Sequence, residues 1–201
     1  MFRLSMYRIA ILSFILGNIF VYSNSEACFD FTKKITSPLR AAPESFEKDL
    51  TDRDHDWATT SGTVEKPIAD LLKALLDPKT IRNDSNTHIQ LVEKTSADFL
   101  KLQEEQIEVK PVFFLTLNWT ELWAYSLLTG TSTAPTSLLI SYEKTSGTSH
   151  IQHYCGNILL KQLSPKNTGV FLYEEMKADH RNSSDILNNL KGTLRTLRTP
   201  K

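Results

Sequence analysis

Two glutamates stand where a carboxyl group could transfer protons. Glu121 lies between Trp119 and Trp123, and Glu174 precedes Glu175 in an apolar segment. Neighbouring side chains in a strand point to opposite faces, so at most one of Glu174 and Glu175 faces an interior. A carboxyl group buried among apolar side chains has a raised pKa and can act as a general acid or base. Glu121 and Glu174 are therefore the candidate catalytic residues.

The surroundings of Glu121 depend on the conformation of residues 118–121. If one strand runs through them without interruption, Glu121 lies on the same face as Trp119, Trp123 and Tyr125. If these residues instead form a tight turn, Glu121 lies at the tip of a hairpin, in water. The sequence is compatible with both conformations.

Two histidines and a run of aspartates invite a metal-site interpretation that their spacing does not support. His150 and His153 are three residues apart, so on one strand without a bulge they point to opposite faces and cannot bind one metal together. The run Asp52–Asp56 resembles the start of a calcium loop, but its sixth and twelfth positions hold Trp57 and Thr63 instead of Gly and Glu. We predict no metal ligand and no cofactor.

The N-terminal residues predict export. Arg3 and Arg8 precede an apolar run, Ile11–Tyr22, and small residues follow at Ser25 and Ala27. A positive start, a short apolar run and small residues before a cleavage site are typical of a secretory signal peptide. A membrane anchor is the alternative, but a span needs about 20 apolar residues. We predict a signal peptide over residues 1–27, cleaved after Ala27, and a secreted or periplasmic product.

Cleavage at that position would make Cys28 the first residue of the mature chain. In an oxidising compartment Cys28 could form a disulfide with Cys155, the only other cysteine. In the chain-entropy model a loop of this length contributes about 4–5 kcal/mol of stability. Lipid attachment to Cys28 is the alternative, although Ser25 stands where such a signal has Leu or a similar apolar residue. Neither thiol has an activating histidine that would indicate cysteine catalysis.

The composition narrows the class of protein. The chain has 201 residues, of which 40% are hydrophobic, enough for one domain with a core. Its 23 basic and 23 acidic residues balance, so it lacks the positive charge of a dedicated nucleic-acid-binding protein. Three N-x-Ser/Thr sequons begin at Asn83, Asn118 and Asn182, and they matter only if the protein is exported in a eukaryote.

Helical and strand patterns follow a charged lead-in over residues 28–56. Residues 57–65 are rich in Thr and Val and predict a strand, and Pro67 then opens a helix. That helix has apolar residues at helical spacing, namely Ile68, Leu71, Leu72, Leu75 and Leu76. A short strand over His88–Glu93 is expected after it.

From Ile107 onward the chain predicts an antiparallel meander and then a helix. Strands are expected over 112–128, 137–144, 148–163 and 170–178, joined by short turns. The final helix can be capped by Asn182, Ser183 or Ser184, and its apolar face carries Ile186, Leu187, Leu190, Leu194 and Leu197. Gly192 interrupts this helix at a cost of about 1 kcal/mol relative to Ala, which close packing or a cavity could explain.

This order of elements resembles the START-like helix-grip superfamily, also called SRPBCC or Bet v 1-like. The residues that carry the resemblance are SGTVEKPI at 61–68, LLDP at 75–78, Trp119 with Trp123, Gly147, Gly156 and the strand Val170–Glu174. It covers residues 57–198, and residues 79–106 fit it poorly. The resemblance implies an α+β fold over residues 57–201, in which a curved antiparallel sheet wraps around a long C-terminal helix.

The resemblance also implies a cavity between sheet and helix for a lipid or another hydrophobic small molecule. The residues expected to line it are Trp119, Trp123, Tyr125, Tyr142, Tyr154, Phe171, Tyr173, Leu190 and Leu194. For each of them the alternative is a place in the ordinary core, because aromatic residues on a half-buried sheet are more often core than ligand contacts.

Three functions remain open from the sequence. The first is an exported protein that binds a hydrophobic ligand without converting it. The second is a cyclase- or hydratase-like enzyme that uses Glu121 or Glu174 in the same cavity. The third is an interaction protein whose own side chains fill the cavity. Basic residues late in the final helix, Lys191, Arg195, Arg198 and Lys201, would suit transient contact with a membrane surface, and they also suit the negative end of the helix dipole.

Overall fold

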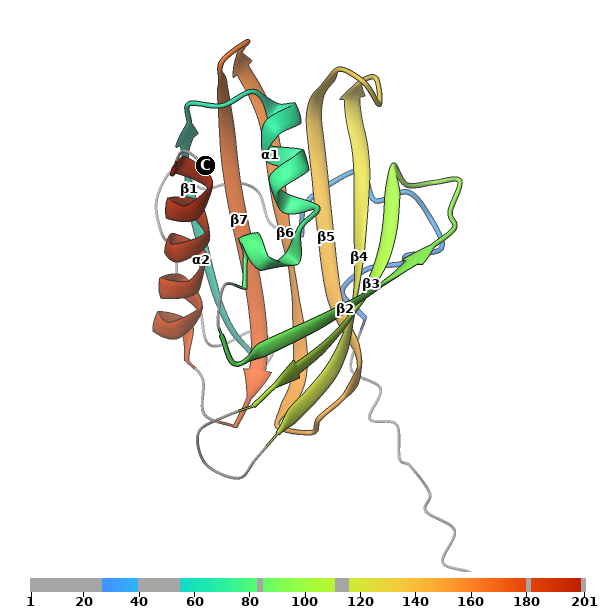
Figure 1. The fold of residues 1–201 in the computed structure, drawn as a ribbon, viewed down its shortest axis with the longest axis vertical. Coiled ribbons are helices and arrows are strands. Elements are labelled where there is room, and N and C mark those ends of the chain that lie inside the picture. Colours follow the sequence, from blue (N-terminus) through green and yellow to red (C-terminus); the bar gives the residue numbers. More distant parts are fainter. Residues whose placement is uncertain (1–26, 40–54, 83–84, 111–115, 180–181, 200–201) are drawn as a thin grey trace, which may run out of the picture.

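A single antiparallel sheet organises the chain (Figure 1). The computed structural model describes residues 27–39, 55–82, 85–110, 116–179 and 182–199. Its elements are β1 (Asp56–Val64), α1 (Ile68–Leu75), the 3₁₀ turn η1 (Pro78–Thr80), β2 (Thr87–Lys94), β3 (Lys101–Val109), β4 (Leu117–Gly130), β5 (Pro135–Gly147), β6 (Ile151–Ser164), β7 (Asn167–Ala178) and α2 (Ser183–Arg198). The seven strands are ordered β1-β7-β6-β5-β4-β3-β2, so the first strand joins the edge formed by the last one.

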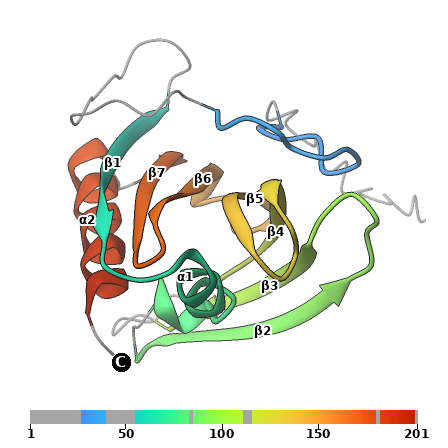
Figure 2. The same cartoon turned by 90° about the horizontal axis from the view of Figure 1, so that it is seen from above.

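The sheet bends around α1, which lies inside its curve (Figure 2). Pro67 stands at the N-cap of α1, and Ile68, Leu71 and Leu75 are buried against the concave face of the sheet, as their spacing predicts. Asp77 then accepts a hydrogen bond from the backbone N–H of Lys79 and starts η1.

Helix α2 closes the other part of the concave side. Asn182 caps it and forms a capping box with Asp185, so the backbone N–H groups of Asn182, Ser184 and Asp185 all have acceptors. Ile186, Leu190, Leu194 and Leu197 are buried against the sheet, mainly against β1 and β7. The predicted apolar face is therefore correct, with Leu187 only partly buried.

Three predicted strands differ in their bounds from the observed ones. β3 begins at Lys101, six residues before the predicted start of β structure, because its inward positions hold the polar Gln103 and Glu105. β4 runs without interruption from Leu117 to Gly130, and residues 111–115 lie outside the described part. β5 extends to Gly147, which has a φ of 108° and so ends the strand in a conformation that favours glycine.

The N-terminal segment 27–39 covers the convex face of the sheet (Figure 2). Phe29 is buried, and Leu39 packs beside a small cluster of Trp57, Phe171 and Tyr173. Most of the other residues in this segment of the predicted charged lead-in are exposed, and residues 40–54 of it lie outside the described part. Residues 1–26, including nearly all of the predicted signal peptide, lie outside the described part. Among the described helices, none has the length and apolar character to cross a membrane.

Candidate functional site: a cavity beneath helix α2

A cavity of about 580 Å³ lies between α2 and the concave face of the sheet. The residues that surround it come from the two positions after η1, from strands β2, β3, β4, β6 and β7, and from α2. They are Ile81, Arg82, Thr87, Val109, Trp119, Ile151, Tyr154, Glu174, Met176, Asn188, Asn189, Gly192, Thr193, Arg195 and Thr196. Ligand sites of small molecules typically measure roughly 300–1,000 Å³, so this space is large enough for one.

The cavity has a buried floor and an exposed rim. Tyr154, Glu174 and Met176 on β6 and β7 are buried, whereas Asn188, Asn189, Arg195 and Thr196 on α2 are exposed. Gly192 lies in the helical wall, and a Cβ atom added there would meet no other atom within 4 Å. The missing side chain therefore leaves open space in the cavity, which is one of the two explanations that the sequence offered for this glycine.

A buried ion cluster stands beside the cavity. Arg82, just after η1, donates to Glu105 Oε2 at 2.8 Å and to Glu121 Oε2 at 2.5 Å. The side chains of Glu105 and Glu121 are 1% and 0% exposed. η1 fixes the position of Arg82, because the hydroxyl of Thr80 donates to the backbone carbonyl of Ala74 at 2.6 Å and so ties η1 to α1.

Glu121 lies on the inner face among aromatic side chains, so of the two conformations that the sequence allows, the uninterrupted strand is the one observed. Its Oε1 accepts the indole N–H of Trp119 at 2.6 Å, and its Oε2 accepts that of Trp123 at 3.0 Å. With Arg82 added, both oxygens are occupied by donors. This network fixes the orientation of the Glu121 side chain and leaves it poorly placed to take a proton from a ligand.

The cluster contains two carboxyl groups and one guanidinium, and the unequal number of charges affects the pKa of Glu105. Burial raises the pKa of Glu105 to about 7, and the charge of Glu121 adds to the rise while Arg82 opposes it. Burial by itself lowers the pKa of Arg82, but the charges of Glu121 and Glu105 raise it overall, so Arg82 remains charged. Near neutral pH the cluster can therefore hold a proton on Glu105.

Glu174 is the carboxyl group that reaches the cavity wall. Its Oε2 accepts hydrogen bonds from the hydroxyls of Tyr142 at 3.2 Å and Tyr154 at 3.1 Å. Burial raises the pKa of both tyrosines, so their hydroxyls stay protonated and act as donors. Glu175 points to the opposite face, as the alternation of the strand predicts.

The predicted ligand-binding residues fall into three groups. Trp119 and Tyr154 line the cavity. Trp123, Tyr125, Tyr142, Leu190 and Leu194 are buried in the main core but do not line it. Phe171 and Tyr173 were predicted wrongly, because they lie on the convex face beside Trp57. On β7 it is Val170, Leu172, Glu174 and Met176 that point inward.

Sequence reasoning missed Arg82 and Glu105. Arg82 lies in residues 79–106, which fitted the resemblance poorly. A signal for Glu105 exists in the alternation of Gln103, Glu105 and Ile107, all buried in the structure. This alternation indicates a buried Glu105 only if a cation is known to pair with it. That cation is Arg82, which lies 23 positions earlier in the chain.

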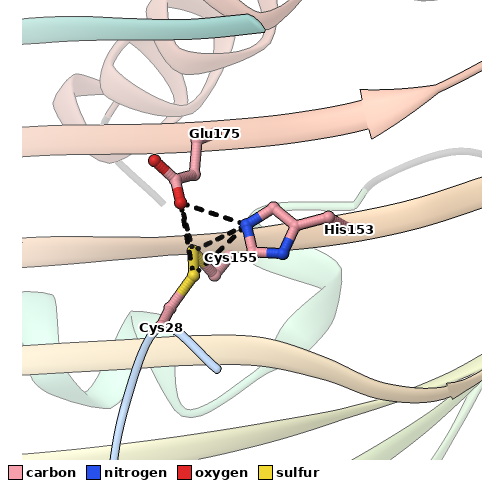
Figure 3. A group of neighbouring side chains, drawn as sticks. All are labelled: Cys28, His153, Cys155 and Glu175. Carbon is pink, nitrogen blue, oxygen red and sulfur yellow. Dashed lines mark hydrogen bonds and ion pairs between the residues drawn. A yellow bond between two sulfur atoms is a disulfide. The ribbon is translucent and has the colours of Figure 1, made fainter. Parts of the chain in front are cut away.

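On the convex face, Cys28, His153, Cys155 and Glu175 place four potential metal-binding atoms within 4.8 Å of one another (Figure 3). Cys28 and Cys155 form a disulfide with a Cα–Cα distance of 6.5 Å, so in this state neither sulfur is a thiolate that could bind a metal. His153 contacts Glu175 at 3.0 Å, whereas His150 contacts Asp179 near the surface at 2.7 Å. The two histidines thus have separate partners.

Comparison with solved structures identifies the fold. The lipid transfer and protein localization domain of human StarD13 has a TM-score of 0.52 at 9% identity, over 79% of this chain and 91% of that domain. A STAR-related lipid transfer protein from Xanthomonas axonopodis has a TM-score of 0.48 at 12% identity, over 76% of this chain and 96% of that one. An aromatase/cyclase from Streptomyces has a TM-score of 0.46 at 13% identity, over 71% of this chain and 86% of that one. No family model matches the chain, and no curated protein matches it in sequence. The predicted START-like helix-grip fold is confirmed.

Proposed function

We propose that this chain is an exported protein that binds a hydrophobic small molecule or lipid in the cavity beneath α2. The observation that carries the proposal is the cavity of about 580 Å³ between the sheet and a helix that lacks a side chain at Gly192. A core filled by its own side chains would leave less than the roughly 300 Å³ typical of ligand sites. The size of the cavity therefore favours ligand binding over the filled-cavity alternative.

The walls favour a ligand with an apolar body and a few polar groups. Ile81, Val109, Ile151 and Met176 offer apolar contacts, whereas Glu174 and the asparagines, threonines and Arg195 of the rim offer hydrogen bonds. The fold is that of a lipid transfer domain, and lipids have this amphipathic character. For transient membrane contact, Lys191 and Arg195 are exposed on α2, while Arg198 donates to the backbone of Thr63.

Glu174 supports a second candidate function, proton transfer to or from a bound ligand. It is the carboxyl group in the cavity wall, and two tyrosine hydroxyls fix its orientation. Glu121 is a poorer candidate than the sequence suggested, because donors occupy both of its oxygens and it does not line the cavity. Turnover that Glu174→Gln abolishes, with ligand binding retained, would establish the enzyme.

The experiment is native mass spectrometry of the protein purified from its own secretory compartment, followed by extraction of bound material. We expect one apolar molecule per chain. The same measurement on Gly192→Phe, whose ring would enter the cavity, should show the bound fraction reduced at least tenfold. Gly192→Ala is the matched control, because it adds only a methyl group at the same site, and it should retain the ligand. Equal loading of Gly192→Phe and the wild type would refute binding in this cavity.

A further inference from the structure

A buried carboxyl group on the convex face has no ion-pair partner among the described residues. Glu143 on β5 is 8% exposed, and no cationic side chain of the described chain forms an ion pair with it. Glu175, by contrast, contacts His153 at 3.0 Å and accepts a hydrogen bond from the hydroxyl of Tyr173. A buried carboxylate is unfavourable unless a charge or several donors compensate for its lost hydration.

The donors that reach Glu143 belong to the N-terminal segment. Glu143 stands opposite Cys155 in the pairing of β5 with β6, and the disulfide holds Cys28 over this position. The backbone N–H of Phe29 donates to Glu143 Oε2 at 3.1 Å, and the backbone N–H of Cys28, the preceding residue, is directed at the same carboxyl group and lowers its pKa. Burial nevertheless raises the pKa of Glu143 above its usual value. The disulfide thus holds the nitrogen of Cys28 near a carboxylate that forms no ion pair with a described side chain, although the charge of His153 also lowers its pKa.

We propose that cleavage after Ala27 turns this nitrogen into the ammonium group that Glu143 binds. A signal peptidase adds water across the Ala27–Cys28 amide, the C–N bond breaks, Ala27 keeps the carboxyl group and Cys28 gains a primary amine. At neutral pH that amine is protonated, since an α-amino group has a pKa of about 7.7–8.0. Glu143 is then the counter-ion of the mature N-terminus. The inference rests on the export part of the proposed function and not on the cavity.

The same geometry opposes the lipoprotein alternative. Lipid attachment would convert the Cys28 sulfur to a thioether, which cannot also form the disulfide with Cys155. The Cys28 sulfur therefore serves to fix the chain end, and its nitrogen serves as the charged group. A mature protein with a lipid on Cys28 would contradict the inference directly.

The test is a thermodynamic cycle on the oxidised protein. The exported chain that begins at Cys28 is compared with a chain that retains Ala27, each with Glu143 and with Glu143→Gln, by urea unfolding at pH 7. In the exported chain we expect Glu143→Gln to reduce the folding equilibrium constant at least tenfold more than in the extended chain. Glu174→Gln is the matched control, because it removes a buried carboxylate on the opposite face and should have the same effect in both chains.

A pH series separates the ion pair from a merely structural contact. Pairing raises the pKa of the α-amine above its unfolded value, so the stability gained from it is present at pH 7 and is lost as pH rises through the folded pKa. Glu143→Gln should remove this loss. The variant leaves the other titratable groups of this face in place, namely His55, His153, Tyr173 and Glu175. Any pH dependence that they cause would persist in it.

Each outcome bears on a different step. Intact mass and N-terminal sequencing must show a chain that begins at Cys28 and is lighter than the reduced chain by two hydrogen atoms. A different first residue, or an added acyl chain, overturns both the cleavage site and the inference. A chain that begins at Cys28 but shows equal effects of Glu143→Gln in both forms refutes the ion pair and leaves export intact.

Discussion

Replacing Arg82 with methionine should destabilise the protein strongly at pH 8 and much less at pH 5. Arg82 is the cation of the buried cluster, with donors 2.8 Å from Glu105 and 2.5 Å from Glu121. Methionine keeps the apolar contacts of the long side chain but removes the charge. Two carboxylates of one sign would then remain side by side in a buried site.

The magnitude follows from the geometry. At about 4 Å and an effective dielectric constant near 20, each ion pair contributes about 4 kcal/mol of attraction. Part of this is offset because Arg82 no longer has to be desolvated. Breaking a buried ion pair typically costs about 3–5 kcal/mol, and we expect that loss at pH 8. At pH 5 Glu105 already carries a proton, since its pKa lies at about 7, and the loss should fall to about half.

The assay is urea unfolding at both pH values, followed by tryptophan fluorescence, because Trp119 and Trp123 both donate to Glu121. Lys94→Met is the control: the pair of Lys94 with Glu104 is 43% and 23% exposed, and its loss should cost at most about 1 kcal/mol at either pH. Equal destabilisation by Arg82→Met at pH 5 and pH 8 would refute the argument. Adding Glu105→Gln and Glu121→Gln to Arg82→Met should recover most of the lost stability.

Three further predictions concern stability. The unfolding free energy of the wild type should fall by at most about 3 kcal/mol as pH rises from about 4.5 to about 7. The reason is that the folded state binds the Glu105 proton more tightly than the unfolded state does. Glu105→Gln should remove this fall in urea titrations across the same pH range. Replacing Cys28 and Cys155 with serine should cost about 2–5 kcal/mol, measured by calorimetry, and an unchanged melting temperature would show that the bond is not formed. Gly192→Ala should raise the unfolding free energy by up to about 1 kcal/mol, since the helix gains propensity and the methyl group meets no atom; a loss would mean that the cavity wall is tighter than described.

The two helices were predictable because their signals are local. Ile68, Leu71 and Leu75 repeat at helical spacing, and Asn182 with Asp185 forms a cap within four residues. Strand β3 was not predictable in the same way. Its inward residues Gln103 and Glu105 look like surface residues, because the cation that pairs with Glu105, Arg82, lies more than twenty positions away and Gln103 in turn donates to Glu105.

The aromatic residues of β7 show a second limit. Alternation divides the strand into two faces but does not say which face is the interior. Phe171 and Tyr173 are as apolar as inward residues because the N-terminal segment buries the convex face too. Only the disulfide partner, 127 positions away in sequence, reveals that this face is covered.

If the chain is exported as proposed, the presence of only two cysteines affects the order in which its disulfide can form. Cys28 would cross the membrane long before Cys155, which lies 127 residues later. Its thiol would therefore stay unpaired until most strands of the sheet have crossed as well. No third cysteine exists in the chain, so a wrong pairing within one molecule cannot form, and no disulfide isomerase is needed to correct it. The hazard in this interval lies between molecules, where two chains could join through their first cysteines. Rapid capture of the N-terminal segment by the completed sheet would protect against such dimers.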